Sequence, residues 1–189
     1  MLILIRHGRT VRNAEGVLQG RADIPLDDVG REQARALATA LPGLSRVVAS
    51  PLQRAVETAS ALATKVELDE RFVELDYGSF DGVPVRDVPA ATWEQWRSDP
   101  TFAPPGGESL RQLSQRVRPA LAELAAAAVE QDIAVVSHVS PIKAAMVWAL
   151  GVDEAATWRS HLSPASITRV GWRGTGPILL SFNDTGHLR

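Results

Sequence analysis

The sequence predicts an α/β fold, a three-layer α/β/α sandwich with a mostly parallel central sheet. Strand-like and helix-like stretches alternate along the 189 residues, an order typical of sheets that helices cover on both faces. Residues 2–5, 47–49 and 133–136 are short apolar runs of the kind buried on both faces of a sheet. Each run ends abruptly in polar residues. Because parallel strands end at one edge of the sheet, where ligands bind, we expect these polar residues to meet there.

The first long helix is predicted after the first strand and its loop. Asp27 or Asp28 can serve as its N-cap, and Pro42-Gly43 ends it. The apolar residues between them recur at helical spacing, so we expect this face to pack on the sheet. They are Val29, Ala34, Leu37, Ala38 and Leu41.

The second helix is predicted directly after the strand at residues 47–49. Ser50 has the side chain of an N-cap, and Pro51 suits the first helical position. Arg54 and Thr58 then lie one turn apart near the helix N-terminus. We therefore expect Arg54 to face the edge where the strands end.

The second half of the chain continues the alternation. A short strand is predicted at 66–68, and glycines and prolines mark a loop-rich region over 74–105 with a short helix at 92–97. A long helix covers 110–129, a strand 133–136 and a further helix 140–150. Strands at 167–172 and 178–182 form a closing pair around residues 174–177. We expect one domain, 1–189, with a lid at about 76–107.

Positively chargeable residues follow the predicted strands. Arg6 and His7 end the first run, His138 ends the run at 133–136, and Arg54 begins a helix at the same edge. Such groups would repel one another without an anion between them. The pattern therefore favours a pocket for a phosphate or a carboxylate.

Taken together, these residues resemble the histidine phosphatase superfamily, the phosphoglycerate mutase-like group. The resemblance spans nearly the whole chain, and it implies the fold of that group. It rests on Arg6-His7-Gly8, Asn13, Gln19-Gly20, Leu26 to Gly30 with Gln33-Ala34, Ser50-Pro51-Leu52-Gln53-Arg54-Ala55, Glu74 to Gly78, Gly106-Gly107-Glu108-Ser109 and Ser137-His138.

The residue types suit metal-independent phosphoryl transfer. Fixed cations must hold the three equatorial oxygens of the phosphoryl group, and we expect Arg6, Arg54 and His138 to supply them. Neutral His7 is the expected nucleophile, with one ring nitrogen attacking while a hydrogen bond on the other holds the tautomer. The resemblance assigns a phosphohistidine intermediate to His7.

The leaving oxygen needs a proton, and the match to the family pattern makes Glu74 the expected donor, with Asp76 as the alternative. The charge of the phosphate would favour the protonated form of Glu74.

Further residues are expected around the substrate. Asn13 would donate to the phosphate, and Gln19 with the backbone of Gly20 would touch the rest of the molecule. Val139, where many relatives carry glycine, would narrow the pocket floor. Arg9 departs from the residue usual after Arg-His-Gly and would add local positive charge.

Other aromatic and histidine residues are not assigned to the site. Trp93 and Trp96 would either cover the pocket or serve as packing anchors. His161 and His187 lack a strand-end context and are expected at the surface.

Composition narrows the class of protein. The net charge of −2, with acidic and basic residues mixed along the chain, does not indicate a surface that binds nucleic acid or membranes. The absence of cysteine excludes disulfides and thiol catalysis. The first apolar run is too short for a signal or a membrane span. We expect a cytoplasmic enzyme without a cofactor that acts on a small phosphorylated metabolite; a homodimer is left open.

Two subfamilies look similar. Residues 138–143 and 183–188 resemble the acid phosphatase domain of actinobacterial bifunctional ribonuclease H/acid phosphatase proteins, and the length and motifs also resemble α-ribazole phosphatases. The substrate is left open between α-ribazole phosphate, a sugar phosphate, a phosphoglycerate derivative and a broad range. A phosphoglycerate mutase would share every catalytic residue, but we expect hydrolysis because residues 81–105 are compact and the chain stops soon after its last strand. A non-catalytic phosphate-binding regulatory protein is the third reading.

Overall fold

The computed structural model describes residues 1–174 and 176–189, and within them six strands form one sheet in the order β3-β2-β4-β1-β5-β6. The strands β1, β2, β3 and β4 run parallel, whereas β5 and β6 are antiparallel additions beside β1. The expected mostly parallel α/β sheet is confirmed. The bounds are β1 Leu2–Arg6, β2 Arg46–Ala49, β3 Glu67–Leu68, β4 Ile133–Ser137, β5 Ile167–Arg173 and β6 Gly176–Asp184.

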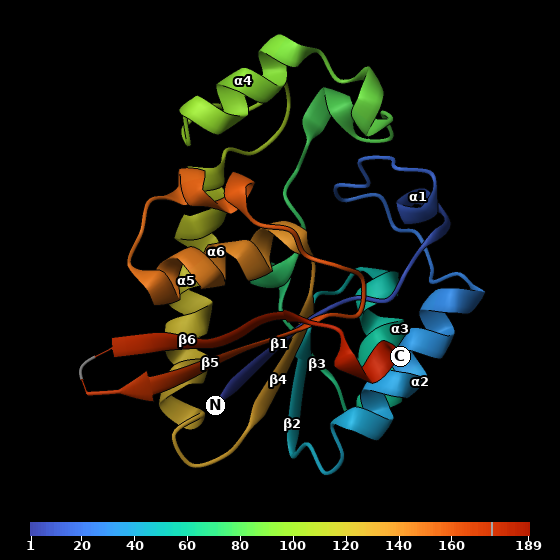
Figure 1. Cartoon of the computed structure of the whole chain (residues 1–189), viewed down its shortest axis with the longest axis vertical. Helices are drawn as coiled ribbons and strands as arrows, with labels where there is room; N and C mark the ends of the chain where they lie inside the picture. The colour runs from blue at the N-terminus through green and yellow to red at the C-terminus, as the bar shows by residue number, and fades with distance from the viewer. Residues whose placement is uncertain (175) are drawn as a thin grey trace.

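Helices cover both faces of the sheet, as Figure 1 shows: α2 and α3 lie on one side, and α5 and α6 lie on the other. The short helices α1 and α4 stand beyond the carboxyl ends of the parallel strands (Figure 1). The bounds are α1 Val11–Ala14, α2 Asp28–Ala40, α3 Gln53–Leu62, α4 Ala90–Ser98, α5 Leu110–Ala127 and α6 Val139–Leu150.

The side chains of β1 divide the core in two. Leu2 and Leu4 belong to the apolar cluster under α5 and α6, and Ile3 and Ile5 belong to the cluster under α2 and α3. Successive side chains of a strand point to opposite faces, so a strand with helices on both sides must be apolar at every position. This is the reason for the uninterrupted aliphatic run near the N-terminus.

The register of β1 and β4 sets the position of the two strand-end histidines. Arg6 of β1 lies beside Ser137 of β4, and the pairing is parallel. His7 and His138 therefore leave the sheet next to each other, and their ring centroids are 5.1 Å apart.

The predicted cap of α3 is wrong. The helix begins at Gln53 after Leu52, two residues later than Pro51, and the backbone N–H of Gln53 donates to Asp23 Oδ1 at 2.7 Å. Ser50 lies two residues too early to cap this helix, and its hydroxyl accepts from the N–H of Leu52 at 3.4 Å and lies 2.8 Å from Nε2 of His138. A side chain distant in sequence has taken the capping role.

Smaller differences concern single residues. The cap of α2 is Asp27, as expected, but Val29 is exposed and Gly30 takes the buried position. The strand at 66–68 is shorter, and the helix at 92–97 longer, than predicted. Of the turn predicted at 174–177, position 175 lies outside the described residues, and β6 already begins at Gly176.

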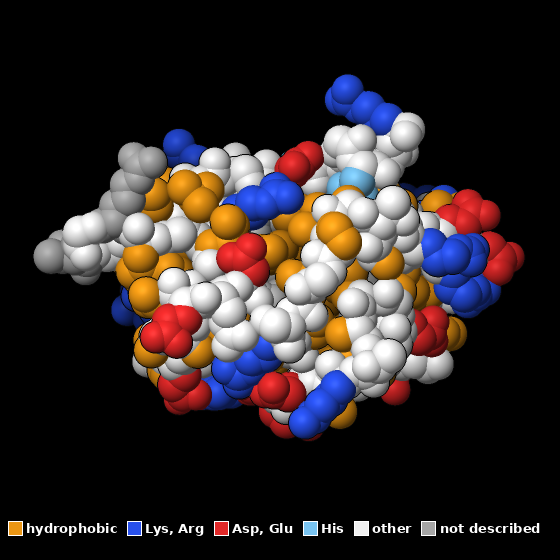
Figure 2. Space-filling model, turned by 90° about the horizontal axis from the view of Figure 1, so that it is seen from below, with side chains coloured by type: hydrophobic (Ala, Val, Ile, Leu, Met, Phe, Trp, Pro, Cys, Tyr) orange, Lys and Arg blue, Asp and Glu red, His pale blue; other side chains and the backbone are white. Residues whose placement is uncertain are grey.

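One end of the molecule carries mixed charge. Figure 2, which views the end of the molecule opposite α4, shows Lys or Arg side chains interspersed with Asp or Glu. Among the described helices, none is long and apolar enough to cross a membrane.

Candidate active site

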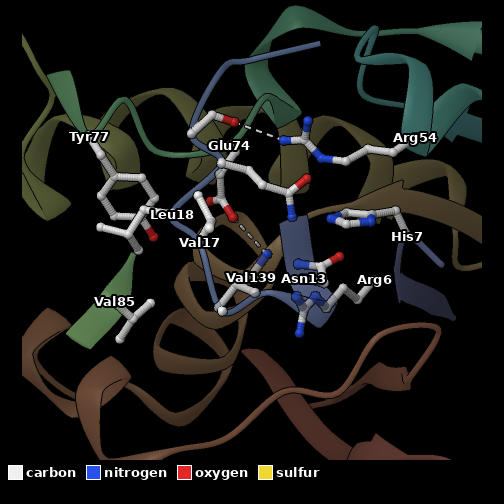
Figure 3. Close-up of a pocket in the computed structure, with 13 residues that line it drawn as sticks. Arg6, His7, Asn13, Val17, Leu18, Arg54, Glu74, Tyr77, Val85 and Val139 are labelled. Carbon is white, nitrogen blue, oxygen red and sulfur yellow. Dashed lines mark hydrogen bonds between the residues drawn. The ribbon is translucent and has the colours of Figure 1, made fainter. Parts of the chain in front are cut away.

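A cavity of about 270 Å³ opens where β1 ends. It brings together all but one of the residues that the sequence predicted for the site (Figure 3): Arg6, His7, Asn13, Gln19, Gly20, Arg54, Glu74 and Val139. The missing one is His138, which is fully buried and does not line the cavity. The sequence did not predict the remaining lining residues, which are Gly16, Val17, Leu18, Tyr77 and Val85.

His7 presents a neutral imidazole ring to the cavity. Its ring points into the cavity (Figure 3), and its Nδ1 lies 2.7 Å from the carbonyl oxygen of Gly8. A carbonyl only accepts, so Nδ1 carries the proton and Nε2 keeps its lone pair. Burial, and then the charges of Arg54 and Arg6, lower the pKa of His7 well below its ordinary value.

Gly8 is required by the packing of the loop after His7. A Cβ at this position would lie 2.5 Å from the carbonyl oxygen of Gly30, at the start of α2. The N–H of Gly8 donates to Thr58 Oγ1 at 3.0 Å, and that hydroxyl donates to the carbonyl of Arg54 at 2.7 Å. The Thr58 hydroxyl of α3 therefore links the backbone of the loop after His7 to the backbone of Arg54.

Arg54 is almost fully buried, and each of its nitrogens has a partner. Nη1 donates to the carbonyl of Ala22 at 2.7 Å, Nη2 to that of Gly20 at 2.8 Å, and Nε to Nδ1 of His138 at 3.2 Å. Each Nη carries two hydrogens, so one on each remains for a ligand. Burial lowers the pKa of Arg54.

Arg6 is the second cation of the cavity. Its Nη1 donates to the carbonyl of Leu162, whereas its buried Nε has no hydrogen-bond partner among the described residues. Burial lowers its pKa to about 10, with Glu74 opposing the shift, so Arg6 is charged at neutral pH. A buried guanidinium with unused donors is suited to a phosphate.

The expectation that His138 adds a third positive charge is wrong. Its ring is fully buried, and Nδ1 accepts from the Nε of Arg54. Since a guanidinium only donates, this nitrogen is unprotonated, and Nε2 carries the proton toward Ser50. Burial, and then Arg54 and His7, lower the pKa of His138 well below its ordinary value. His138 is placed to orient Arg54.

Glu74 is fixed by three backbone donors. Oε1 accepts from the N–H groups of Leu75 at 2.8 Å and Ser140 at 3.0 Å, and Oε2 accepts from that of Val139 at 3.1 Å (Figure 3). Val139 and Ser140 open α6, whose N-terminus favours negative charge. The carboxylate is therefore aimed into the cavity with little freedom to turn.

An ion pair behind the cavity supports Glu74. Arg116 donates from Nη2 to the carbonyl of Glu74 at 3.1 Å and from Nη1 to that of Arg71 at 2.7 Å. Its Nε lies 2.8 Å from Glu108 of the Gly-Glu motif. The alternative donor Asp76 does not line the cavity, because one of its oxygens accepts from the N–H of Gly78 and the other lies 3.5 Å from Arg21.

Thr10 orients the two amide side chains of the cavity. Its buried hydroxyl lies 3.1 Å from Asn13 Oδ1 and 2.9 Å from Gln19 Oε1, and its N–H also donates to Asn13 Oδ1. With both amide oxygens engaged by Thr10, the amide NH₂ groups are the free ends. The NH₂ group of Asn13 is thus available for the predicted donation to the phosphate, and that of Gln19 for the predicted contact with the rest of the substrate.

Trp93 and Trp96 of α4, and Arg9, do not contribute to the cavity. Trp96 is 1% exposed and packs against Trp93 and Trp158, and neither Trp93 nor Trp96 lines the cavity. They are packing anchors. Arg9 forms an ion pair with Asp27 at 2.8 Å, so its charge is not directed at the cavity.

Among residues 1–174 and 176–189, no group of three or more His, Cys, Asp or Glu side chains could hold a metal ion.

A profile of the histidine phosphatase superfamily (branch 1) matches residues 2–185. The chain belongs to this superfamily. The resemblance noted in the sequence is thereby confirmed. A similar protein is the bifunctional protein Rv2228c of Mycobacterium tuberculosis, 34% identical over 198 residues that cover 99% of this chain and 54% of the relative. The chain thus spans about half the length of that relative.

Solved structures of histidine phosphatases superpose closely on this fold. A phosphoserine phosphatase from Entamoeba histolytica, solved with phosphoserine and with 3-phosphoglyceric acid, has a TM-score of 0.93 at 30% identity and covers 100% of this chain and 98% of its own. A structure from Escherichia coli that bears the name of an alpha-ribazole-5′-P phosphatase has a TM-score of 0.84 at 28% identity, covering 97% and 95%.

Proposed function

We propose that this protein hydrolyses phosphomonoesters of small metabolites through a phosphohistidine on His7. One observation carries the proposal: the bond from Nδ1 to Gly8 leaves Nε2 of a neutral, buried imidazole free in a cavity that also holds two guanidinium groups. Membership of the superfamily supports it.

In the first step Nε2 of His7 attacks phosphorus as the bond to the organic oxygen breaks. Arg6 and Arg54 hold the equatorial oxygens, with Asn13 as a neutral donor. A proton from the Glu74 carboxyl passes to the leaving oxygen. In the second step a water attacks phosphorus, Glu74 takes its proton, and the N–P bond breaks so that its electron pair returns to His7.

Glu74 serves both steps. Three backbone N–H groups fix its carboxyl group in one position beside the cavity. The same group can therefore give a proton to the leaving oxygen and later take one from the attacking water.

A panel of phosphomonoesters with released phosphate as the readout tests the proposal. Activity is expected after exhaustive dialysis and in the presence of EDTA, because the charges on the phosphoryl group come from Arg6 and Arg54. The matched control is the same preparation with Mg²⁺ restored. A dialysed protein that works only after a divalent ion returns would contradict this mechanism.

Phosphoglycerate mutase activity is the second candidate, since a mutase uses the same catalytic groups. It must hold a phosphoglycerate by its carboxylate, yet the two cations among the described lining residues both serve the phosphoryl site. With 3-phosphoglycerate and a trace of the bisphosphate, we expect no significant 2-phosphoglycerate and only slow release of phosphate. Interconversion faster than phosphate release would favour the mutase.

We also propose a single domain over residues 1–189, a lid at about 76–107 and a cytoplasmic location.

A further inference from the structure

The cavity has an apolar half that the catalytic scheme does not use. Val17, Leu18, Tyr77, Val85 and Val139 line it across from the arginines (Figure 3). Burial raises the pKa of Tyr77, so its hydroxyl is neutral. The half that receives the organic part of a substrate is therefore uncharged except for Glu74.

A pairing between distant segments builds the apolar wall. Val17 forms a bridge to Pro84. The N–H of Leu18 donates to Val83 at 3.0 Å, and that of Val85 donates to Gly16 at 2.8 Å. The backbone N–H groups of Leu18 and Val85 are used in this pairing. A ligand therefore meets the side chains of these two residues.

Two of the cations near the cavity but outside its lining are already engaged. Arg21 lies 3.5 Å from Asp76 and 3.4 Å from Glu108, and Lys143 donates to the carbonyl of Ser160 at 2.6 Å. A carboxylate on the organic part of a substrate would lose water without gaining a cation from the residues that line this half, and it would approach Glu74. Both effects oppose its binding.

We infer that this cavity selects monoesters whose organic group is small, uncharged and apolar, and discriminates against monoesters that carry a carboxylate. The inference rests on the proposed function. It separates this protein from the Entamoeba phosphatase, whose two bound ligands both bear a carboxylate. Leu18 and Val85 are the specificity-determining side chains, because they come from the two paired segments of the wall.

A matched pair of substrates tests the inference. n-Butyl phosphate and 3-(phosphonooxy)propanoate are similar in length and differ in the terminal carboxylate. We expect kcat/KM to be about tenfold to a hundredfold higher for butyl phosphate, the range expected for an unpaired polar group that loses water. Phosphoserine and 3-phosphoglycerate should fall with the carboxylate substrate.

A substitution at the partly exposed Val85 gives a test whose expected result, a gain for the carboxylate substrate, cannot arise from loss of folding. Val85 is 42% exposed, so Val85→Arg introduces a cation without filling the core. We expect it to improve the carboxylate substrate relative to butyl phosphate by about fivefold, the upper range for a partly exposed ion pair. Val85→Gln, which is polar but uncharged, is the matched control and should not shift the ratio toward the carboxylate.

The outcomes separate the inference from the proposed function. If p-nitrophenyl phosphate and every other monoester are inert, the proposed function fails. If monoesters are hydrolysed but the two matched substrates react equally well, the function stands and the inference is overturned. Arg12, which lies beside Gly82 outside the cavity lining, is then tested as the missing cation by Arg12→Gln.

Discussion

His7→Ala is expected to lower phosphomonoester turnover by about 10⁴-fold or more, the largest effect of any substitution in this chain. The nucleophile has no substitute, because the second histidine of the site has both ring nitrogens engaged by Arg54 and Ser50. Water alone would have to attack phosphorus. Rapid quenching with a ³²P-labelled substrate should trap a phosphoprotein that is labile in acid and stable in base, and this label should be absent from the variant.

His161→Ala is the control for His7→Ala. His161 does not line the cavity, so His161→Ala should keep both the label and the activity. Phosphate binding by the His7→Ala protein, followed by NMR or calorimetry, reports that the arginine site is still formed. A label retained in His7→Ala would assign the nucleophile elsewhere.

Glu74→Gln is expected to slow alkyl phosphates by about a hundredfold to ten-thousandfold, the usual contribution of a general acid. Aryl phosphates should slow much less, because a phenolate leaves without full protonation. The substitution places an amide NH₂ among three N–H donors, which disturbs the start of α6. That disturbance affects both substrate classes, so the alkyl-to-aryl ratio isolates the proton transfer.

Asp76→Asn is the matched control for Glu74→Gln. Asp76 lies in the same loop, two residues after Glu74, but outside the cavity lining, so we expect Asp76→Asn to leave the alkyl-to-aryl ratio unchanged. An equal loss for both substrate classes in Glu74→Gln, or a larger change of the ratio in Asp76→Asn, would move the donor role away from Glu74.

The sequence was sufficient wherever a single segment determines the outcome. The aliphatic runs of β1 and β4 predicted both central strands, and the residues just after them predicted where the site lies. Arg6 and His7 could be predicted as site residues from their position at the end of a strand. The parallel order of the sheet then brought them to Arg54, as expected for this class of fold.

What the sequence did not predict depends on contacts between distant segments. Ser50 was expected as a cap because serine favours that position, but its hydroxyl meets His138, 88 residues later. The charge of His138 could not be judged without knowing that the Nε of Arg54 faces it. The apolar wall arises from the pairing of Val17 with Pro84, and neither segment alone signals a lining role.

The main chain, more than side chains, positions the reactive groups. His7 is held by one carbonyl, Arg6 by another, Arg54 by two, and Glu74 by three backbone N–H groups. Every residue type except proline offers the same N–H, and all offer the same carbonyl. Substitutions at the supporting positions can therefore accumulate while the reactive geometry persists, as long as the backbone path is kept. Divergent chains can in this way share one chemistry and differ in the wall that selects the substrate.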